Sequence, residues 1–316
     1  MTTTTLDELD GKILQSLSKN CRISYNGLGN EIGLTSKSVK ARVKKMQASG
    51  VIDSFIVKVN PLVFGYSKFC LLVVRMNSKA ADQDHIRRII NLLGDILYTG
   101  HVLSGISTFK FAIKKEAEEK IKLLVDMIGP DILIQNQTSV FPNVKEQPTF
   151  IDFRIIKCLL DNPRMEISDI SEKISMSSKT VARRLDKMIE NHVLDFTLQF
   201  NFTAIRGYIV SVVSTYIEKG SYAKVLERSY EDLKDSFCIY SPMLSQQDVV
   251  YWLYFSKDVF ALDANVKRIE SYPGVRKTDV FIPISIEYHK EVIIKEIERK
   301  LSDKSPWAKE ISNVIT

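Results

Sequence analysis

The sequence has few of the residues that build disulfide frameworks, metal centres and hydrolytic active sites. Its four cysteines are far apart and include no Cys-x-x-Cys pair, which predicts free thiols in a reducing compartment. Its four histidines belong to no Ser-His-Asp grouping or metal-ligand cluster, and there is no phosphate-binding loop. We therefore expect no catalytic residues, no metal ion and no resident cofactor.

Long apolar runs are also absent. No stretch approaches the ~20 residues that cross a bilayer. The N-terminal segment, MTTTTLDELDG, lacks the apolar centre of a signal peptide. We expect a cytoplasmic protein without a membrane partner. The 316 residues, 45% of them apolar, are enough for the cores of two to four domains. The net charge of +6 is mild, so the distribution of charge matters more than its sum.

The chain contains an internal repeat. Residues 10–53 and 152–195 align without a gap and share 14 identities in 44 positions. The match resumes at NPLVFGY (60–66) and NFTAIRGY (201–208), after a shift of one residue. The sequence therefore predicts a duplicated unit of about 142 residues rather than a solenoid of short repeats.

Each unit begins with three helical segments and a strand, and a tight turn at Gly33-Leu34 precedes the third helix of the first unit. This order is typical of a winged helix-turn-helix, and a βαββαβ pattern typical of a ferredoxin-like domain follows it. The predicted fold class is α+β, with the whole unit duplicated. The predicted domains are a winged helix-turn-helix at 1–62, a ferredoxin-like domain at 63–147, a second winged helix-turn-helix at 148–204, a second ferredoxin-like domain at 205–288 and a C-terminal helical tail at 289–316.

The third helix of the first unit is basic and amphipathic. In LTSKSVKARVKKMQASGVI (34–52), Val39, Val43 and Met46 lie within about 60° of one another at 100° per residue. The lysines lie opposite and must point outward if this apolar stripe packs on the first two helices. A solvated face is the ordinary alternative, but the preceding turn and the serines at the start of the helix favour contacts with duplex DNA.

The second copy differs on its outward face, because Asp186 stands where the first copy has Lys44. Residues 6–60 carry a net charge of +4, whereas residues 151–201 are neutral. We expect the first helix to dominate affinity and the second to bind weakly, contact a different half-site or assist assembly. The candidate DNA-binding residues are Ser36, Lys37, Ser38, Lys40, Arg42, Lys44, Lys45, Ser178, Lys179, Thr180, Arg183, Arg184 and Lys187.

The segment from LDELDG (6–11) to NPLVFGY (60–66) resembles the N-terminal half of the Lrp/AsnC transcription regulators. It has their leading Leu-Asp, an Arg after the first helix, the turn into the recognition helix and the Asn-Pro…Gly linker. The usual chain of that family has one unit, so this chain resembles a covalent pseudo-dimer. The resemblance implies a sequence-specific regulator of transcription that binds double-stranded DNA and forms a homodimer or higher oligomer through its ferredoxin-like domains.

The resemblance also implies a small-molecule effector, an amino acid or a related compound. Effector-binding members carry Gly-x-x-Asp between the second and third strands of this domain. Here the matching segments are 105–108 and 245–248, and each keeps half of the motif. A plain turn is the alternative. The candidate effector residues are Gly105, Ser107, Thr108, Ser245 and Asp248.

Two other functions stay open. Siroheme decarboxylases resemble the same architecture, and His101 is the histidine placed to face a cleft in such an enzyme. The other is an assembly module that has lost DNA binding, which the neutral second helix-turn-helix allows.

Overall fold

The computed structural model describes residues 5–75, 83–103, 105–129, 132–138, 142–233, 238–240 and 249–302. The first half contains α1 (Glu8–Lys19), α2 (Tyr25–Ile32), α3 (Ser36–Ala48), β1 (Ile52–Val59), η1 (Pro61–Phe64), β2 (Lys68–Arg75), α4 (Gln83–Leu93), β3 (Asp95–Val102), β4 (Ile106–Ile113), α5 (Ala117–Ile128) and β5 (Ile132–Thr138). The second half contains α6 (Phe150–Asp161), α7 (Ile167–Ile174), α8 (Ser178–Glu190), β6 (Leu194–Phe200), η3 (Phe202–Ala204), β7 (Ile209–Ile217), α9 (Tyr222–Leu233), β8 (Cys238–Tyr240), β9 (Val249–Ser256), α10 (Val259–Glu270), β10 (Val275–Phe281), β11 (Pro283–Tyr288) and α11 (Lys290–Ser302).

Each half begins with the same three-helix arrangement. Capping boxes begin α1 at Asp7 and α6 at Thr149. In each, the side chain before the helix accepts from the backbone N–H three residues later, whose own side chain accepts from the first residue's N–H. Gly33 ends α2 with a φ of 75°, and Ser175 ends α7 with a φ of 54°. Both lie in the left-handed region, which turns the chain sharply into the third helix. The predicted helix-turn-helix pattern is therefore present twice.

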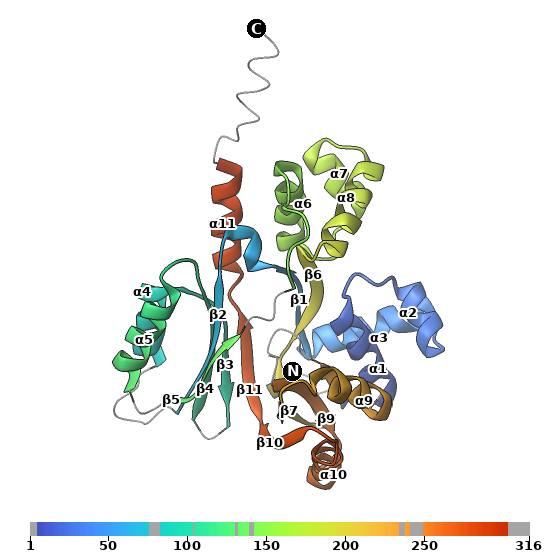
Figure 1. Cartoon of the computed structure of the whole chain (residues 1–316). Helices are drawn as coiled ribbons and strands as arrows, with labels where there is room; N and C mark the ends of the chain where they lie inside the picture. Colours follow the sequence, from blue (N-terminus) through green and yellow to red (C-terminus); the bar gives the residue numbers. More distant parts are fainter. Residues whose placement is uncertain are drawn as a thin grey trace.

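Each half then forms a ferredoxin-like sheet, as the βαββαβ pattern predicts. The second sheet has the order β10-β7-β9-β8, and the same order, β5-β2-β4-β3, occurs in the first. Figure 1 shows α4 and α5 on one side of the first sheet, with the rest of the chain toward its other side. The α+β fold class predicted from the sequence is thus confirmed.

The C-terminal end of the chain returns to the first half. Strand β11 pairs antiparallel with β3 and becomes the fifth strand of the first sheet, although the predicted range 205–288 assigned it to the second domain. Helix α11 follows, and it packs against α6 of the second helix-turn-helix and against β3 (Figure 1). The predicted tail helix thus docks inside this chain, with Ile293 and Ile297 buried in a core that includes residues of α6.

The two halves share their helix-turn-helix cores. Strands β1 and β6, the wings of the two units, pair with each other as a two-stranded antiparallel sheet. Phe64 of the first unit packs in the core of the second helix-turn-helix, with its ring centroid 6.0 Å from that of Phe153. Leu198 and Phe202 of the second unit are buried with Val43 in the core of the first. Each unit therefore completes the hydrophobic core of the other.

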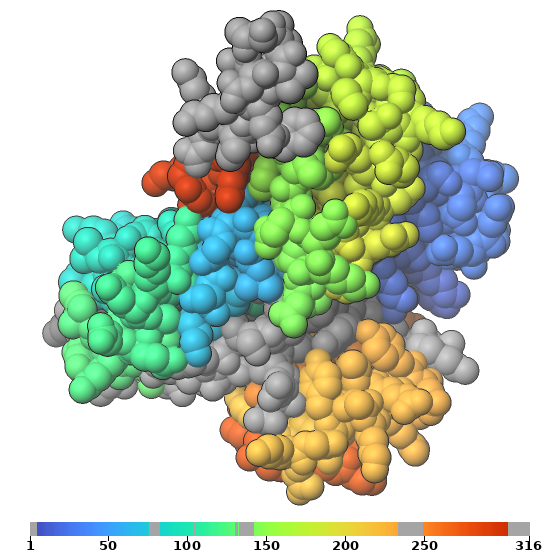
Figure 2. All heavy atoms as spheres, turned by 45° about the horizontal axis from the view of Figure 1, so that its top comes forward, coloured from blue at the N-terminus to red at the C-terminus, as the bar shows by residue number. Residues whose placement is uncertain are grey.

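The arrangement brings the two helix-turn-helix units together and separates the helices of the ferredoxin-like domains. In Figure 2 the first winged unit (blue) adjoins the second (yellow-green), while the first domain's helices (teal) lie at the left and the second domain's helices (orange) lie apart from them at the bottom. None of the helices in the described part of the chain has the length and apolarity of a membrane-spanning segment.

The shared core predicts that a substitution in the first unit will loosen the second. Phe64→Ala should lower the free energy of unfolding by about 3–5 kcal/mol, the usual cost of truncating a buried aromatic. Amide hydrogen exchange should rise in α6 and α8 as well as around η1. Phe150→Ala is the control, because Phe150 is 46% exposed at the start of α6. Faster exchange confined to the first unit would contradict the shared core.

A buried lysine lies on the face of the first sheet opposite its helices. Lys110 of β4 is 2% exposed and lies between Leu71 and Tyr98 on the neighbouring strands. Burial and the nearby positive charge of Lys58 lower the pKa of Lys110 to about 7. Charging this side chain therefore opposes folding.

The depressed pKa of Lys110 gives the protein a pH-dependent stability that Lys110→Met should remove. Between about pH 7 and the ordinary lysine pKa of 10.5, the unfolded chain binds one more proton than the folded chain, so wild-type stability rises with pH. The variant's advantage should be largest below about pH 7 and should shrink as the pH rises. Urea unfolding across this range measures the difference, with Lys122→Met at an exposed position as the control. An advantage that does not change with pH would contradict this assignment.

Candidate nucleic-acid interface

The turn between α2 and α3 is set by backbone contact. A Cβ at Gly29 would lie 2.4 Å from the carbonyl oxygen of Leu34, so only glycine permits this approach. The Thr35 side chain caps α3 by accepting a hydrogen bond from the Ser38 N–H at 3.2 Å. Val39 and Val43 are fully buried beneath the helix. These contacts fix which face of α3 points outward.

The outward face of α3 is strongly positive. Ser36, Lys37, Lys40, Lys44 and Lys45 are exposed, and Ser38 is half-buried near the start of the helix. No acidic residue lies on α3, and the four lysines form no ion pair within the described residues. The helix therefore presents free ammonium groups and short hydroxyls on one surface, the combination that binds phosphates and base edges.

Helix α8 has the same construction with less positive charge. Ser177 caps it, and Val181, Leu185 and Met188 form its buried stripe. Ser178, Lys179 and Arg183 are exposed, Thr180 is half-buried, and the Ser178 hydroxyl lies 3.1 Å from that of Ser171. Asp186 is exposed among them, so a carboxylate interrupts the positive face.

Two candidate residues, Arg42 and Arg184, are half-buried and contact the first helix of their own domain. Arg42 Nη1 lies 2.8 Å from Asp7 Oδ2 and 2.7 Å from Asp10 Oδ1. The hydrogen bonds to Asp7 and Asp10 raise the pKa of the Arg42 guanidinium. Arg184 makes the equivalent contacts at 3.0 Å to Thr149 Oγ1 and Asp152 Oδ1.. Arg42 and Arg184, which the sequence suggested as DNA contacts, thus tie the recognition helix to the capping box of its own domain.

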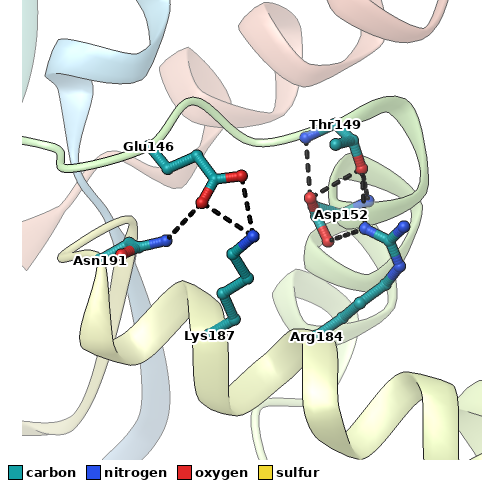
Figure 3. A network of polar contacts seen from close by, with 6 residues as sticks. All are labelled: Glu146, Thr149, Asp152, Arg184, Lys187 and Asn191. Carbon is teal, nitrogen blue, oxygen red and sulfur yellow. Dashed lines mark hydrogen bonds and ion pairs between the residues drawn. The ribbon is translucent and has the colours of Figure 1, made fainter.

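Glu146, in the segment that joins the two halves before α6, neutralises a third candidate DNA-binding residue, Lys187. Lys187 Nζ lies 2.8 Å from the Glu146 carboxylate, and Asn191 Nδ2 also donates to this carboxylate at 3.5 Å. Figure 3 shows Glu146 reaching from the linker onto the last turns of α8, beside the Arg184 cluster. Lys187 is exposed but already paired, unlike its counterpart Lys45.

A pair of arginines, which the sequence analysis did not assign to a site, joins the two helix-turn-helix units. Arg22 Nη1 donates to the carbonyl oxygens of Pro163 at 2.7 Å and Met165 at 2.9 Å. Arg164 donates in return to the carbonyl oxygens of Cys21 and of Ile23. The available signal was the identity of Arg22 and Arg164 in the two repeats. Their exchange fixes the placement of the two recognition helices.

The arginines also stack on aromatic rings across the same interface. The Arg22 guanidinium carbon lies 5.4 Å from the centroid of the Phe196 ring on β6. That of Arg164 lies 4.6 Å from the Tyr25 ring and 5.3 Å from the Phe55 ring. Cation–π contacts in partly buried positions add to the hydrogen bonds and hold the guanidinium planes in place.

The candidate effector residues of the first unit do not converge on one point. Gly105 forms the turn after β3 with a φ of 72°, and the Ser107 hydroxyl is buried 3.3 Å from His101 Nδ1. Thr108 lines a cavity between the two sheets. His101 Nε2 lies 2.7 Å from Gln83 Nε2, so both ring nitrogens are engaged. Ser245 and Asp248 lie outside the described residues.

Comparison with known proteins identifies the DNA-binding units. Residues 6–53 and 151–195 match the winged helix-turn-helix DNA-binding family. The chain carries two winged helix-turn-helix domains. No group of acidic, histidine and cysteine side chains that could hold a metal ion occurs among the described residues.

The relatives include transcriptional regulators that are about as long as one repeat unit of this chain. The HTH-type transcriptional regulator LrpB of Bacillus subtilis is 28% identical over 141 residues, 45% of this chain and 90% of that protein. The regulatory protein AsnC of Haemophilus influenzae is 24% identical over 147 residues, 44% of this chain and 97% of that protein. The chain therefore has homologues among the Lrp/AsnC regulators. The solved siroheme decarboxylase NirDL aligns with 98% of this chain and 99% of its own at a TM-score of 0.49 and 14% identity, too distant to inform function.

The Glu146–Lys187 pair predicts that removal of one linker charge will strengthen DNA binding by the second unit. Glu146→Gln keeps the side-chain size and frees Lys187 for a phosphate. The slope of log affinity against log salt should steepen by about 0.9, the effect of one further phosphate contact. Fluorescence anisotropy with a labelled duplex at several salt concentrations measures this slope.

The control is Glu172→Gln, which removes one charge from an exposed position on α7. An identical change of slope in both variants would show a general effect of net charge and would contradict the role of the ion pair.

Proposed function

We propose that this protein is a sequence-specific DNA-binding transcriptional regulator that acts as a covalent pseudo-dimer. The observation that carries the proposal is the outward face of α3, which has four unpaired lysines above a fully buried apolar stripe within a winged helix-turn-helix. Lysines on such a face neutralise phosphates and release counterions, which supplies sequence-independent affinity. The serines at the start of α3 supply short donors and acceptors for base edges.

The two units have different roles in this proposal. Helix α3 provides most of the affinity, because its outward face has no acidic residue. Helix α8 has Asp186 on its face and Glu146 against Lys187, so it binds phosphates weakly. Paired recognition helices commonly contact half-sites one turn apart, at ~34–36 Å, and an asymmetric operator suits this unequal pair. The internal repeat and the one-unit length of the relatives support an origin by tandem duplication.

Further assembly and effector binding are part of the proposal. Exposed apolar side chains on α4 and α5, at Leu92, Leu123 and Met127, support a homo-oligomer that forms through the ferredoxin-like domains. The position of Thr108 at a cavity supports a small-molecule effector. DNA binding requires the protein to share a compartment with DNA.

The alternative functions have direct tests. The enzymatic alternative is tested by adding siroheme to the purified protein and measuring the absorbance of bound siroheme and the formation of decarboxylated product. Duplex binding tests the alternative of an assembly module.

Charge reversal on α3 should abolish duplex binding. Lys40→Glu combined with Lys44→Glu replaces two phosphate-binding charges by two that repel phosphate, and affinity should fall by at least about a hundredfold at low salt. Binding of duplexes selected from a random pool, measured at two salt concentrations, gives the result.

The matched control is Lys115→Glu combined with Lys122→Glu, because both lysines are exposed on the first ferredoxin-like domain. Equal losses in the two double variants, or no loss in either, would reject α3 as the DNA-binding surface.

A further inference from the structure

Helix α8 presents two rows of side chains on its outward face. Positions four residues apart lie along one line of an α-helix, so Ser178, Ala182 and Asp186 form one row, which we name the short row. Ser178 and Asp186 are exposed and Ala182 is half-buried, so this row lies at the surface. The row beside it consists of the basic residues Lys179, Arg183 and Lys187. No side chain of the short row is longer than that of aspartate.

The equivalent row of α3 is long and positive. It consists of Ser36, Lys40 and Lys44, which are all exposed. Lysine side chains extend far enough to reach phosphates at the edges of a groove, whereas serine, alanine and aspartate end close to the backbone. The short row therefore allows α8 to come close to the floor of a groove, where the edges of the bases lie.

Contacts on the inner side of α8 hold the short row outward. Val181 is fully buried and Leu185 is 5% exposed beneath the helix. The Ser177 hydroxyl accepts a hydrogen bond from the Thr180 N–H at 3.2 Å, which fixes the start of the helix. Arg184 ties the middle of the helix to Asp152 of α6. The rotation of α8 about its axis is therefore set by the core of its own domain, and Asp186 keeps its outward position.

The Asp186 carboxylate has no cationic partner among the residues that the structure describes. The basic residues next to it in sequence bind other carboxylates, since Arg184 lies against Asp152 and Lys187 against Glu146. Arg183, one turn before Asp186, is exposed and forms no ion pair within the described part of the chain. A free carboxylate on this face repels phosphates, so a duplex can bind closely here only where a base offers it a hydrogen-bond donor.

Cytosine is the base whose major-groove edge suits a carboxylate best. A carboxylate can only accept hydrogen bonds, and cytosine presents the donor N4 amine without an acceptor beside it. Adenine presents a donor amine next to the acceptor N7, while guanine and thymine present acceptors. A short carboxylate near the groove floor therefore favours cytosine and disfavours guanine and thymine.

We propose that Asp186 is a specificity-determining residue of the second recognition helix, and that its carboxylate accepts a hydrogen bond from the N4 amine of a cytosine in the major groove. This inference rests on the proposed function and deepens it, because it makes α8 a reader of bases although it binds phosphates weakly. Lys44 of α3 can only donate at the equivalent position, so no cytosine is required in the other half-site. The two half-sites then differ, and the duplex binds in one orientation.

The first test compares the duplexes that the full chain and its variants select from a random pool. The wild type should select a cytosine at one position of one half-site. Asp186→Ala should reduce the preference for cytosine at that position from at least about fivefold to none and keep the preferences elsewhere. Asp186→Asn should shift the preference to adenine, because an amide donates to N7 and accepts from the N6 amine. The matched control is Glu172→Ala, which removes the same charge from an exposed position on α7 and should keep every preference.

The second test changes the base instead of the protein. N4-methylcytosine at the selected position still pairs with guanine, but its methyl group replaces the N–H that points into the major groove. The affinity of the wild type for this duplex should fall at least about fivefold, and that of Asp186→Ala should stay the same. Equal effects of the methyl group on the two proteins would overturn the proposal.

The selection also distinguishes this inference from the proposed function. If Asp186→Ala binds all duplexes more tightly and its base preferences match those of the wild type, the carboxylate only repels phosphates and the role of Asp186 is rejected. The proposed function then stands, because the wild type still selects particular duplexes. If the wild type selects no duplex, both the proposed function and the role of Asp186 are overturned.

Discussion

The reciprocal exchange between the two winged helix-turn-helix units is the constraint on which the rest of the structure depends. Each unit sends an arginine, Arg22 or Arg164, onto carbonyl oxygens of the other, and each contributes a strand to the β1–β6 ribbon. Neither helix-turn-helix core is complete without the other unit, because Phe64 fills one and Phe202 fills the other. The relative position of α3 and α8 is consequently set by the same contacts that stabilise the domains. A DNA-binding protein built in this way has its half-site spacing fixed by folding rather than by a flexible linker.

Fixed spacing also explains how two unequal recognition helices can work together. In the proposed function, binding of phosphates by α3 holds α8 beside the duplex at high effective concentration, so that α8 needs little affinity of its own. A carboxylate at Asp186 and a paired lysine at Lys187 are then tolerable, and they can favour one orientation of the chain on an asymmetric site. A symmetric homodimer cannot make this distinction, since both of its recognition helices carry the same residues.

The elements that follow local rules could be predicted from the sequence, and those that depend on distant partners could not. The helical spacing of Val39, Val43 and Met46 predicted the buried face of α3. The internal repeat predicted the equivalent helix, α8. Pairing of β11 with β3 joins segments almost 190 residues apart, and no local pattern encodes it. The same holds for Arg42, which has the sequence context of a DNA contact but lies against Asp7 and Asp10. A charged residue on a basic helix can thus face DNA or form an ion pair within its own domain, and the sequence around it does not distinguish the two.

The pattern of identity between the repeats now has a physical meaning. Residues that hold the fold are identical in both copies: Asp10 and Asp152, Arg22 and Arg164, Arg42 and Arg184. Three outward positions of the recognition helices differ: Lys40 and Ala182, Ala41 and Arg183, Lys44 and Asp186. Covalent fusion makes this division possible, because each unit always meets the same partner and its outward face can change without disturbing a second identical copy. The arginines that join the units are the same in both copies, and because each binds backbone carbonyls of the other half, the residues that supply those carbonyls, such as Cys21 and Pro163, can differ. The charge differences at these outward positions are what the proposed function expects of a fused pair in which one unit supplies affinity and the other selects orientation.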